Sequence, residues 1–235
     1  MSGLLEVIAL HENDARRAEE GGADRVELLG SLDDDGMSPE PAMVEKTRAR
    51  IDIELRPMVR LRPGFGTDGG EATRLRGLIM SYLDAGADGV VLGFLNGHGD
   101  VDTEVVHALV GEGDWPWTFH RAVDHALDAR RAWQVLPDLP RVDQVLTAGS
   151  PRGVEHGLDD LLQTIRDVPR AAGLVMAGGG LAPEHVPWLA RAGVTSFHIG
   201  SRARPQGSYK AWVDADLVSS WKHLVDTEVR HAHPG

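Results

Sequence analysis

The segment EGGADRVELLG, residues 20–30, has a pattern that returns twice along the chain, as DAGADGVVLGF at 84–94 and as RAGVTSFHIGS at 191–201. Each copy is typical of a helix end followed by a glycine and a short β-rich run. A glycine at that place suits the left-handed residue that ends many helices. The spacing from Gly22 to Gly86 matches two strand-plus-helix units of about 32 residues. The repeat therefore predicts strands and helices in alternation.

Hydrophobic periodicity extends this alternation to the whole chain. It predicts eight strands, near residues 4–8, 24–29, 56–61, 88–93, 115–120, 142–147, 173–177 and 195–199. Amphipathic helices fit between and after them, at 12–22, 38–50, 70–86, 102–111, 128–136, 153–167, 183–192 and 211–230. In the second helix we expect Ser38 as the N-cap and Pro39 as the first helical residue.

Units of this number and length predict one α/β domain over residues 1–235, a single (β/α)8 TIM barrel with a parallel closed sheet. The competing architecture is a doubly wound open sheet, which places a glycine fingerprint directly after its first strand. The sequence there reads EVIALHEND, residues 6–14, and contains no glycine. The barrel is therefore the favoured fold.

Composition narrows the classes of partner. The formal net charge is -12 and the basic residues are scattered, so the basic patch that a nucleic acid or an anionic membrane requires is missing. The absence of cysteine removes disulfides, thiolate nucleophiles and thiolate metal ligands. The N-terminal apolar run is short and is broken by Glu6, which is unlike a signal peptide. We expect a cytoplasmic protein that binds neither nucleic acid nor membrane.

Ionisable residues follow several of the predicted strands, where a TIM barrel builds its active site. Strand alternation places Trp117 and Phe119 under the helices and turns His120 towards the barrel mouth. The same alternation predicts one inward polar ring, which consists of Glu6, Glu27, Arg60, His120 and His198. Such groups can act as general acids, bases and charge stabilisers, so Glu6, Glu27, Arg60 and His120 are the candidate catalytic residues. The alternative is a Glu6–Arg60–Glu27 cluster that only neutralises itself inside the barrel.

Two glycine-rich stretches, VMAGGGLAPEHV at 175–186 and HIGSR at 198–202, follow the last two predicted strands. Many TIM barrels hold a phosphate there, on backbone amides and a helix start. A tight turn without a ligand is the alternative. The candidate substrate- or anion-binding residues are Arg62, Arg121, Asp124, Thr147, Gly178, Gly179, Gly180, Gly200, Ser201 and Arg202.

Seven motifs stand in the order and spacing of the CutC copper homeostasis family: LLEVIA, GGADRVELL, PMVRLRPG, WTFHRAVD, VLTAG, VMAGGG and FHIGSR. The chain resembles this family from about residue 4 to residue 202. The resemblance implies a TIM barrel, a cytoplasmic location, self-association with a dimer as the expected form, and a role in copper tolerance and copper binding. The mouth residues that match the family's motifs are Glu6, Glu27, Arg60, Arg62, His120, Arg121, Asp124 and His198.

This chain departs from the family pattern in its lack of thiols. Several relatives carry cysteine where this chain has Ile8 and Leu29, and some carry one at the place of Ile199. Cuprous copper prefers thiolate and thioether ligands, so the loss of thiols predicts a weak Cu(I) site. Met58 and Met176 are the methionines expected near the mouth.

Two functions from different classes follow. The first is a copper-handling protein that binds Cu(II), with His120 and His198 as metal ligands and Glu6 and Glu27 as further donors. The second is a lyase- or isomerase-type enzyme that moves a proton on a small phosphorylated or carboxylated metabolite. In that enzyme a glutamate or His120 transfers the proton, while Arg60 and Arg62 stabilise an oxyanion. No motif names a cofactor beyond the copper that the resemblance implies.

Overall fold

The structure is a computed structural model that describes residues 2–111 and 113–233. Within these residues eight strands form one sheet in the order β3-β2-β1-β8-β7-β6-β5-β4, and each paired neighbour is parallel. The strands are β1 Leu4–Ala9, β2 Arg25–Leu28, β3 Glu54–Pro57, β4 Val90–Leu92, β5 Trp117–Phe119, β6 Val142–Thr147, β7 Val175–Ala177 and β8 Ser196–Ile199.

The two edge strands, β3 and β4, meet and complete the barrel. Met58 and Val91 form a parallel bridge, and the amide of Val59 donates to the carbonyl oxygen of Val91 at 2.8 Å. The amide of Asp88 donates to the carbonyl oxygen of Leu55 at 3.0 Å on the same seam. The predicted TIM barrel is therefore confirmed.

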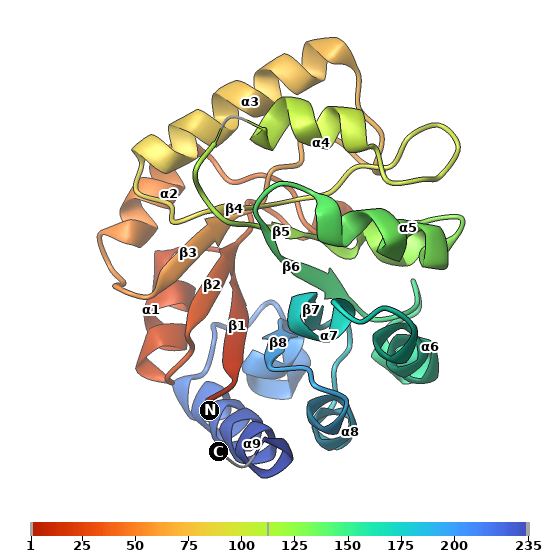
Figure 1. Ribbon diagram of the computed structural model, residues 1–235. Coiled ribbons are helices and arrows are strands. Elements are labelled where there is room, and N and C mark those ends of the chain that lie inside the picture. The colour runs from red at the N-terminus through yellow and green to blue at the C-terminus, as the bar shows by residue number, and fades with distance from the viewer. Residues whose placement is uncertain (1, 112, 234–235) are drawn as a thin grey trace.

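Helices form the outer layer around the strands (Figure 1). They are α1 Glu12–Glu20, α2 Pro41–Arg48, α3 Gly69–Asp84, α4 Thr103–Val110, α5 Ala129–Val135, α6 Val154–Asp167, α7 Ala171–Leu174, α8 Val186–Arg191 and α9 Ala215–Ala232. Among the helices in the described ranges, none combines the length and the apolar character needed to cross a membrane.

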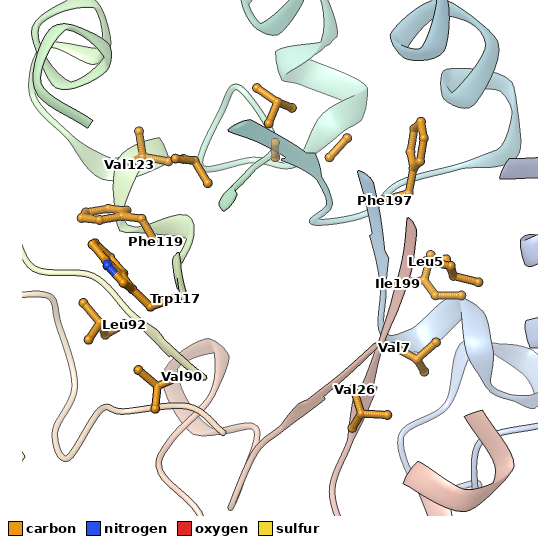
Figure 2. Packing of buried hydrophobic residues seen from close by; sticks show 14 of the residues in the cluster. Leu5, Val7, Val26, Val90, Leu92, Trp117, Phe119, Val123, Phe197 and Ile199 are labelled. Atoms are coloured by element: carbon orange, nitrogen blue, oxygen red, sulfur yellow. The ribbon is translucent and has the colours of Figure 1, made fainter. Parts of the chain in front are cut away.

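The hydrophobic core lies between the strands and the helices. Leu5 and Val7 of β1 are fully buried there, as are Trp117 and Phe119 of β5, whose ring centroids lie 6.2 Å apart. Figure 2 shows these side chains among the apolar groups that pack around the strands. Between the two aromatic residues, Thr118 accepts a hydrogen bond from Arg56 at 2.9 Å. Outward apolar and inward polar side chains alternate along β5, as predicted.

Expectations for the end of the third strand and for the start of the second helix were wrong. The third strand was expected at 56–61, but β3 ends at Pro57 because Val59 turns to pair with Val91 and Arg60 pairs with Ser38. The helix expected to begin at Pro39, with Ser38 as its N-cap, begins at Pro41 with Glu40 as the N-cap. The reason is that Ser38 remains bonded to Arg60: its amide donates to the Arg60 carbonyl oxygen and its hydroxyl accepts from the Arg60 amide at 2.7 Å.

Ion pairs fill the part of the barrel interior that lies towards the N-terminal ends of the strands. Arg56 makes two hydrogen bonds to Asp143, at 2.6 and 2.5 Å, and a further one to Glu54 at 2.6 Å. Arg25 lies 3.6 Å from Glu54 and donates to Glu6 at 2.5 Å. Glu54 and Asp143 are partly exposed, whereas Arg25 and Glu6 are buried. Charges of alternating sign thus run from the partly exposed Glu54 and Asp143 to the buried Glu6.

We expect Arg25→Met to lower the free energy of unfolding by about 3–5 kcal/mol, because it removes the guanidinium partner of the buried Glu6 carboxylate. The matched change Arg16→Met breaks the exposed Arg16–Glu20 pair and should cost at most about 1 kcal/mol. Urea denaturation of both variants measures the difference. Equal losses would show that Glu6 does not depend on Arg25.

Candidate functional site

A cavity of about 330 Å³ opens at the C-terminal ends of the strands. Its polar lining consists of Glu27, Arg60, His120, Arg121, His198, Ser201, Arg202 and Tyr209. Its apolar lining includes Ile8, Leu29, Leu32, Met58, Phe65, Leu146, Leu181 and Ile199. We call it the mouth cavity. It has the size and mixed lining of a site for a small molecule.

Glu6 lies directly beneath the mouth cavity, without lining it. In the strand register Glu6 is level with Arg25 and with His198. Its Oε2 accepts from Arg25 at 2.5 Å, and its Oε1 lies 2.7 Å from His198 Nδ1. Burial opposes ionisation of Glu6, but Arg25 and His198 together lower its pKa to about 2. Glu6 is therefore a buried carboxylate at neutral pH.

His198 connects Glu6 to the cavity. Burial lowers the pKa of His198, but the hydrogen bond to Glu6 and the negative charges of Glu27 and Glu6 outweigh burial and raise that pKa above its ordinary value. The imidazole is therefore protonated more readily than an ordinary histidine. Its Nε2 lies 3.8 Å from Glu27 Oε2, beyond hydrogen-bonding distance.

Glu27 is the titratable group of the cavity wall. It is buried, and among the described residues its Oε1 has no hydrogen-bond partner. Burial is the main cause that raises the pKa of Glu27 to about 7, the charge of Glu6 raises it further, and His198 opposes both. Glu27 can therefore accept or release a proton near neutral pH.

His120 is a neutral hydrogen-bond donor. Its Nδ1 accepts from the amide of Ala122 at 3.1 Å, so we assign the ring proton to Nε2. Burial and, secondarily, the charge of Arg60 lower the pKa of His120 to about 3. The ring stays uncharged at neutral pH, which leaves an N–H donor at the cavity wall.

Arg60 is buried and held by backbone oxygens. Its Nε donates to the carbonyl oxygen of Gly64 at 3.1 Å, and Nη1 donates to that of Asp34. The guanidinium lies 4.8 Å from the centroid of the Phe65 ring. These contacts hold a permanent positive charge in the cavity wall.

Arg121 also lines the cavity, and two other candidate residues position it. Asp124 accepts from Arg121 Nε at 2.8 Å and from the Thr147 hydroxyl at 2.6 Å. The amide of Ala148 donates to the same carboxylate. Asp124 and Thr147 were expected to contact the ligand themselves, but they lie behind Arg121 and line a separate depression.

The two glycine-rich loops reach the cavity with most of their candidate residues. Gly179, Gly180, Gly200, Ser201 and Arg202 line the cavity. Gly178 does not, because its position is packed: a Cβ there would lie 2.7 Å from Leu146 and 2.9 Å from His198. After β7 the 3-10 helix η4 Pro183–His185 leads directly into α8, which together match the helix expected at 183–192. After β8 a three-residue 3-10 helix, η5 Ser201–Ala203, stands at the place of the expected helix start.

Arg62 was expected to face the mouth, and it does not. It is exposed on the loop after β3, where its Nε lies 2.8 Å from Glu71 and its Nη1 donates to Asp68 at 3.2 Å. Sequence reasoning missed Phe65 and Tyr209, which line the cavity from irregular segments. Their aromatic side chains in glycine-containing loops were the only available signal.

The expected histidine pair does not form a metal-ligand cluster. Within the described residues, the group of three potential ligands near this cavity consists of Glu6, Glu27 and His198, with ligand atoms within 4.8 Å of one another. Both oxygens of Glu6 are already bonded, to Arg25 and His198. His120 uses its Nδ1 to accept from Ala122. Of this described group, Glu27 and His198 Nε2 are the potential metal ligands that remain towards the cavity.

The family model and the sequence relatives name the same family. The family model described as the CutC family matches residues 4–203. A CutC family protein of Klebsiella pneumoniae subsp. pneumoniae is 31% identical, over 99% of this chain and 85% of its own. A CutC family protein of Xanthomonas axonopodis pv. citri is 35% identical, over 84% of this chain and 83% of its own.

Solved structures share the fold. A CutC of Streptococcus agalactiae, to which a role in copper homeostasis has been ascribed, aligns with a TM-score of 0.74 and 23% identity, over 84% of this chain and 98% of its own. Phosphoribosylanthranilate isomerase of Thermotoga maritima aligns with a TM-score of 0.62 and 11% identity, over 98% of this chain and 100% of its own. Identities this low carry the fold alone.

Proposed function

Because the chain belongs to the CutC family, we propose that it takes part in copper homeostasis and that its own chemistry is proton transfer on a small anionic metabolite in the mouth cavity. The copper role comes from the family and from the role ascribed to the Streptococcus agalactiae CutC. A role in copper homeostasis is a cellular effect, and an enzyme can serve it without holding the metal.

The side chains of the mouth do not fit a tightly bound copper ion. The chain has no cysteine, and the sulfur of Met176 already accepts a hydrogen bond from Arg25 at 3.6 Å. Met58 lines the cavity and offers one thioether. Cu(I) prefers several thiolate or thioether ligands, so a single thioether is a poor site for it. For Cu(II), Glu27 and His198 Nε2 supply two donors, and His198 favours the protonated form that cannot ligate.

The single observation that supports the enzymatic function is the environment of Glu27. A buried carboxyl group with an unpartnered oxygen and a pKa of about 7 faces a cavity of small-molecule size. Perturbed ionisable groups in a concave site are typical of acid–base catalysts. The family resemblance does not name a reaction, so this group is the strongest guide to one.

His120 and Arg60 complete the proposed chemistry. The Glu27 carboxylate takes a proton from a carbon next to a substrate carbonyl group. The C–H electron pair then forms the C=C bond of an enolate, and the carbonyl π pair moves to oxygen. His120 Nε2–H and the Arg60 guanidinium stabilise that oxyanion. Return of the proton to carbon restores the Glu27 carboxylate, and no co-reactant is consumed.

Hydrogen–deuterium exchange tests this step. Wild-type protein in D₂O should exchange protons next to the carbonyl group in at least one member of a panel of small carbonyl acids and phosphorylated carbonyl compounds, as followed by ¹H NMR. Glu27→Gln keeps the shape of the side chain but removes the base, so we expect a loss of roughly 100-fold or more. The matched variant Glu45→Gln, on the exposed surface of α2, should exchange like wild type. The function would be refuted if wild-type protein exchanged protons in no compound of the panel, or if Glu27→Gln exchanged them at the wild-type rate.

Copper competition tests the other half of the proposal. We expect a thiol chelator of moderate affinity to remove Cu(I) from wild type, because the cavity offers no thiolate. Cu(II) should bind no more tightly to wild type than to His120→Ala combined with His198→Ala. Tight binding of either ion that the double variant loses would make direct copper binding the molecular function.

A further inference from the structure

One wall of the mouth cavity is rich in hydrogen-bond donors. It consists of Gly179 and Gly180 after β7, Ser201 and Arg202 after β8, and Arg121 after β5. Three separate segments of chain therefore meet at this wall, which we call the donor wall. Glu27 and Arg60 come from the ends of β2 and β3, and His120 directly precedes Arg121 after β5.

Arg121 is fixed in one orientation. Its Nε donates to Asp124, and its Nη2 donates to the carbonyl oxygens of Ser150 and Pro151 at 3.1 Å each. The guanidinium packs against Gly179, where a Cβ would lie 2.8 Å from Cζ. Among the described residues no hydrogen bond involves Nη1. The side chain is therefore preorganised, with a donor left over for a ligand.

The backbone of the two loops adds further donors. Gly179 and Gly180 have positive φ values of 84° and 73°, which residues other than glycine rarely adopt. In the described ranges, the amides of Gly179, Gly180, Ser201 and Arg202 take part in no backbone–backbone hydrogen bond outside regular elements. Consecutive free amides of this kind are common anion-binding features of proteins.

The charge of the cavity points to the same ligand class. Arg60, Arg121 and Arg202 line it, and Glu27, with a pKa of about 7, is its one carboxyl group among the described lining residues. Asp124, behind the wall, offsets the charge of Arg121, which leaves the guanidinium groups of Arg60 and Arg202 as the positive excess of the lining. The whole chain carries a formal net charge of -12. A positive cavity in an acidic protein attracts small anions selectively to this place.

We propose that the donor wall binds the phosphate group of a phosphate monoester, so that the substrate of the proposed enzyme is a small phosphorylated carbonyl compound. This inference rests on the proposed function for the reactive end of the molecule. A tetrahedral phosphate presents three oxygens in different directions, which suits donors on three segments of chain. A planar carboxylate has its acceptor sites in one plane, so it matches donors that converge from three segments less well than a tetrahedral phosphate does.

Inorganic phosphate is the probe, at ionic strength matched with chloride. In ¹H–¹⁵N spectra of the full chain we expect phosphate to shift the amides of Gly179, Gly180, Ser201 and Arg202 with one common dissociation constant. Arg121→Met should raise the dissociation constant for phosphate roughly tenfold or more. The matched control Arg130→Met removes a guanidinium from the exposed surface of α5 and should bind like wild type.

The contradicting outcomes are equally definite. Amide shifts scattered over the surface, or equal binding by Arg121→Met, would mean an adventitious ion only. If Arg121→Met does not fold, Arg202→Met takes its place, because Arg202 is an exposed residue of η5 in the same wall. The wild-type amide shifts do not depend on either variant.

The proposed function and this subsite fail separately. If Glu27-dependent exchange occurs on unphosphorylated carbonyl acids while phosphate shifts no donor-wall amide, the subsite is wrong and the function stands. If phosphate binds at the donor wall but Glu27→Gln leaves exchange unchanged, the subsite is supported and the function falls.

Discussion

The carboxylate of Glu6 has no exposed surface, so the barrel must neutralise it from inside, and the site above is arranged by that requirement. Arg25 meets one oxygen and His198 the other, because the strand register sets all three residues at one level. This contact raises the pKa of His198 above its ordinary value and so favours a positive charge on the imidazole, 3.8 Å from Glu27. An ion pair of the barrel interior thus sets the electrostatics of the mouth.

Two carboxyl groups with opposite behaviour result. Glu6 is surrounded by cations and ionises far below neutral pH, whereas Glu27 is buried beside that negative charge and titrates near pH 7. Environments that push the pKa values of neighbouring groups apart are typical of acid–base sites. The same arrangement disfavours a metal, since Arg25 and His198 already occupy the oxygens of Glu6. The chain can therefore belong to the CutC family and still lack good copper ligands, if its contribution to copper homeostasis is enzymatic.

The sequence allowed the barrel and part of the site to be predicted, for a physical reason. Alternation along a strand is strict, so the parity of Glu27, His120 and His198 places all three at the cavity. The same parity misplaced Arg62, because the regular ladder stops at Pro57 and the chain then follows Ser38 and Val91. Parity also cannot predict how deep in the barrel a side chain lies. Glu6 lies one layer below Glu27, and this difference depends on the stagger of neighbouring strands. Tyr209 belongs to an irregular segment, to which no periodicity applies.

The ionisation of Glu27 is the property on which the proposed chemistry depends, and ¹³C NMR of its carboxyl carbon measures that property directly. A titration of the wild-type protein should give a midpoint near pH 7 for Glu27, against the ordinary value of 4.5. In His198→Gln the midpoint should move higher, because a positive charge that favours the carboxylate is removed. A midpoint close to 4.5 in the wild type would contradict the assignment of Glu27 as the base.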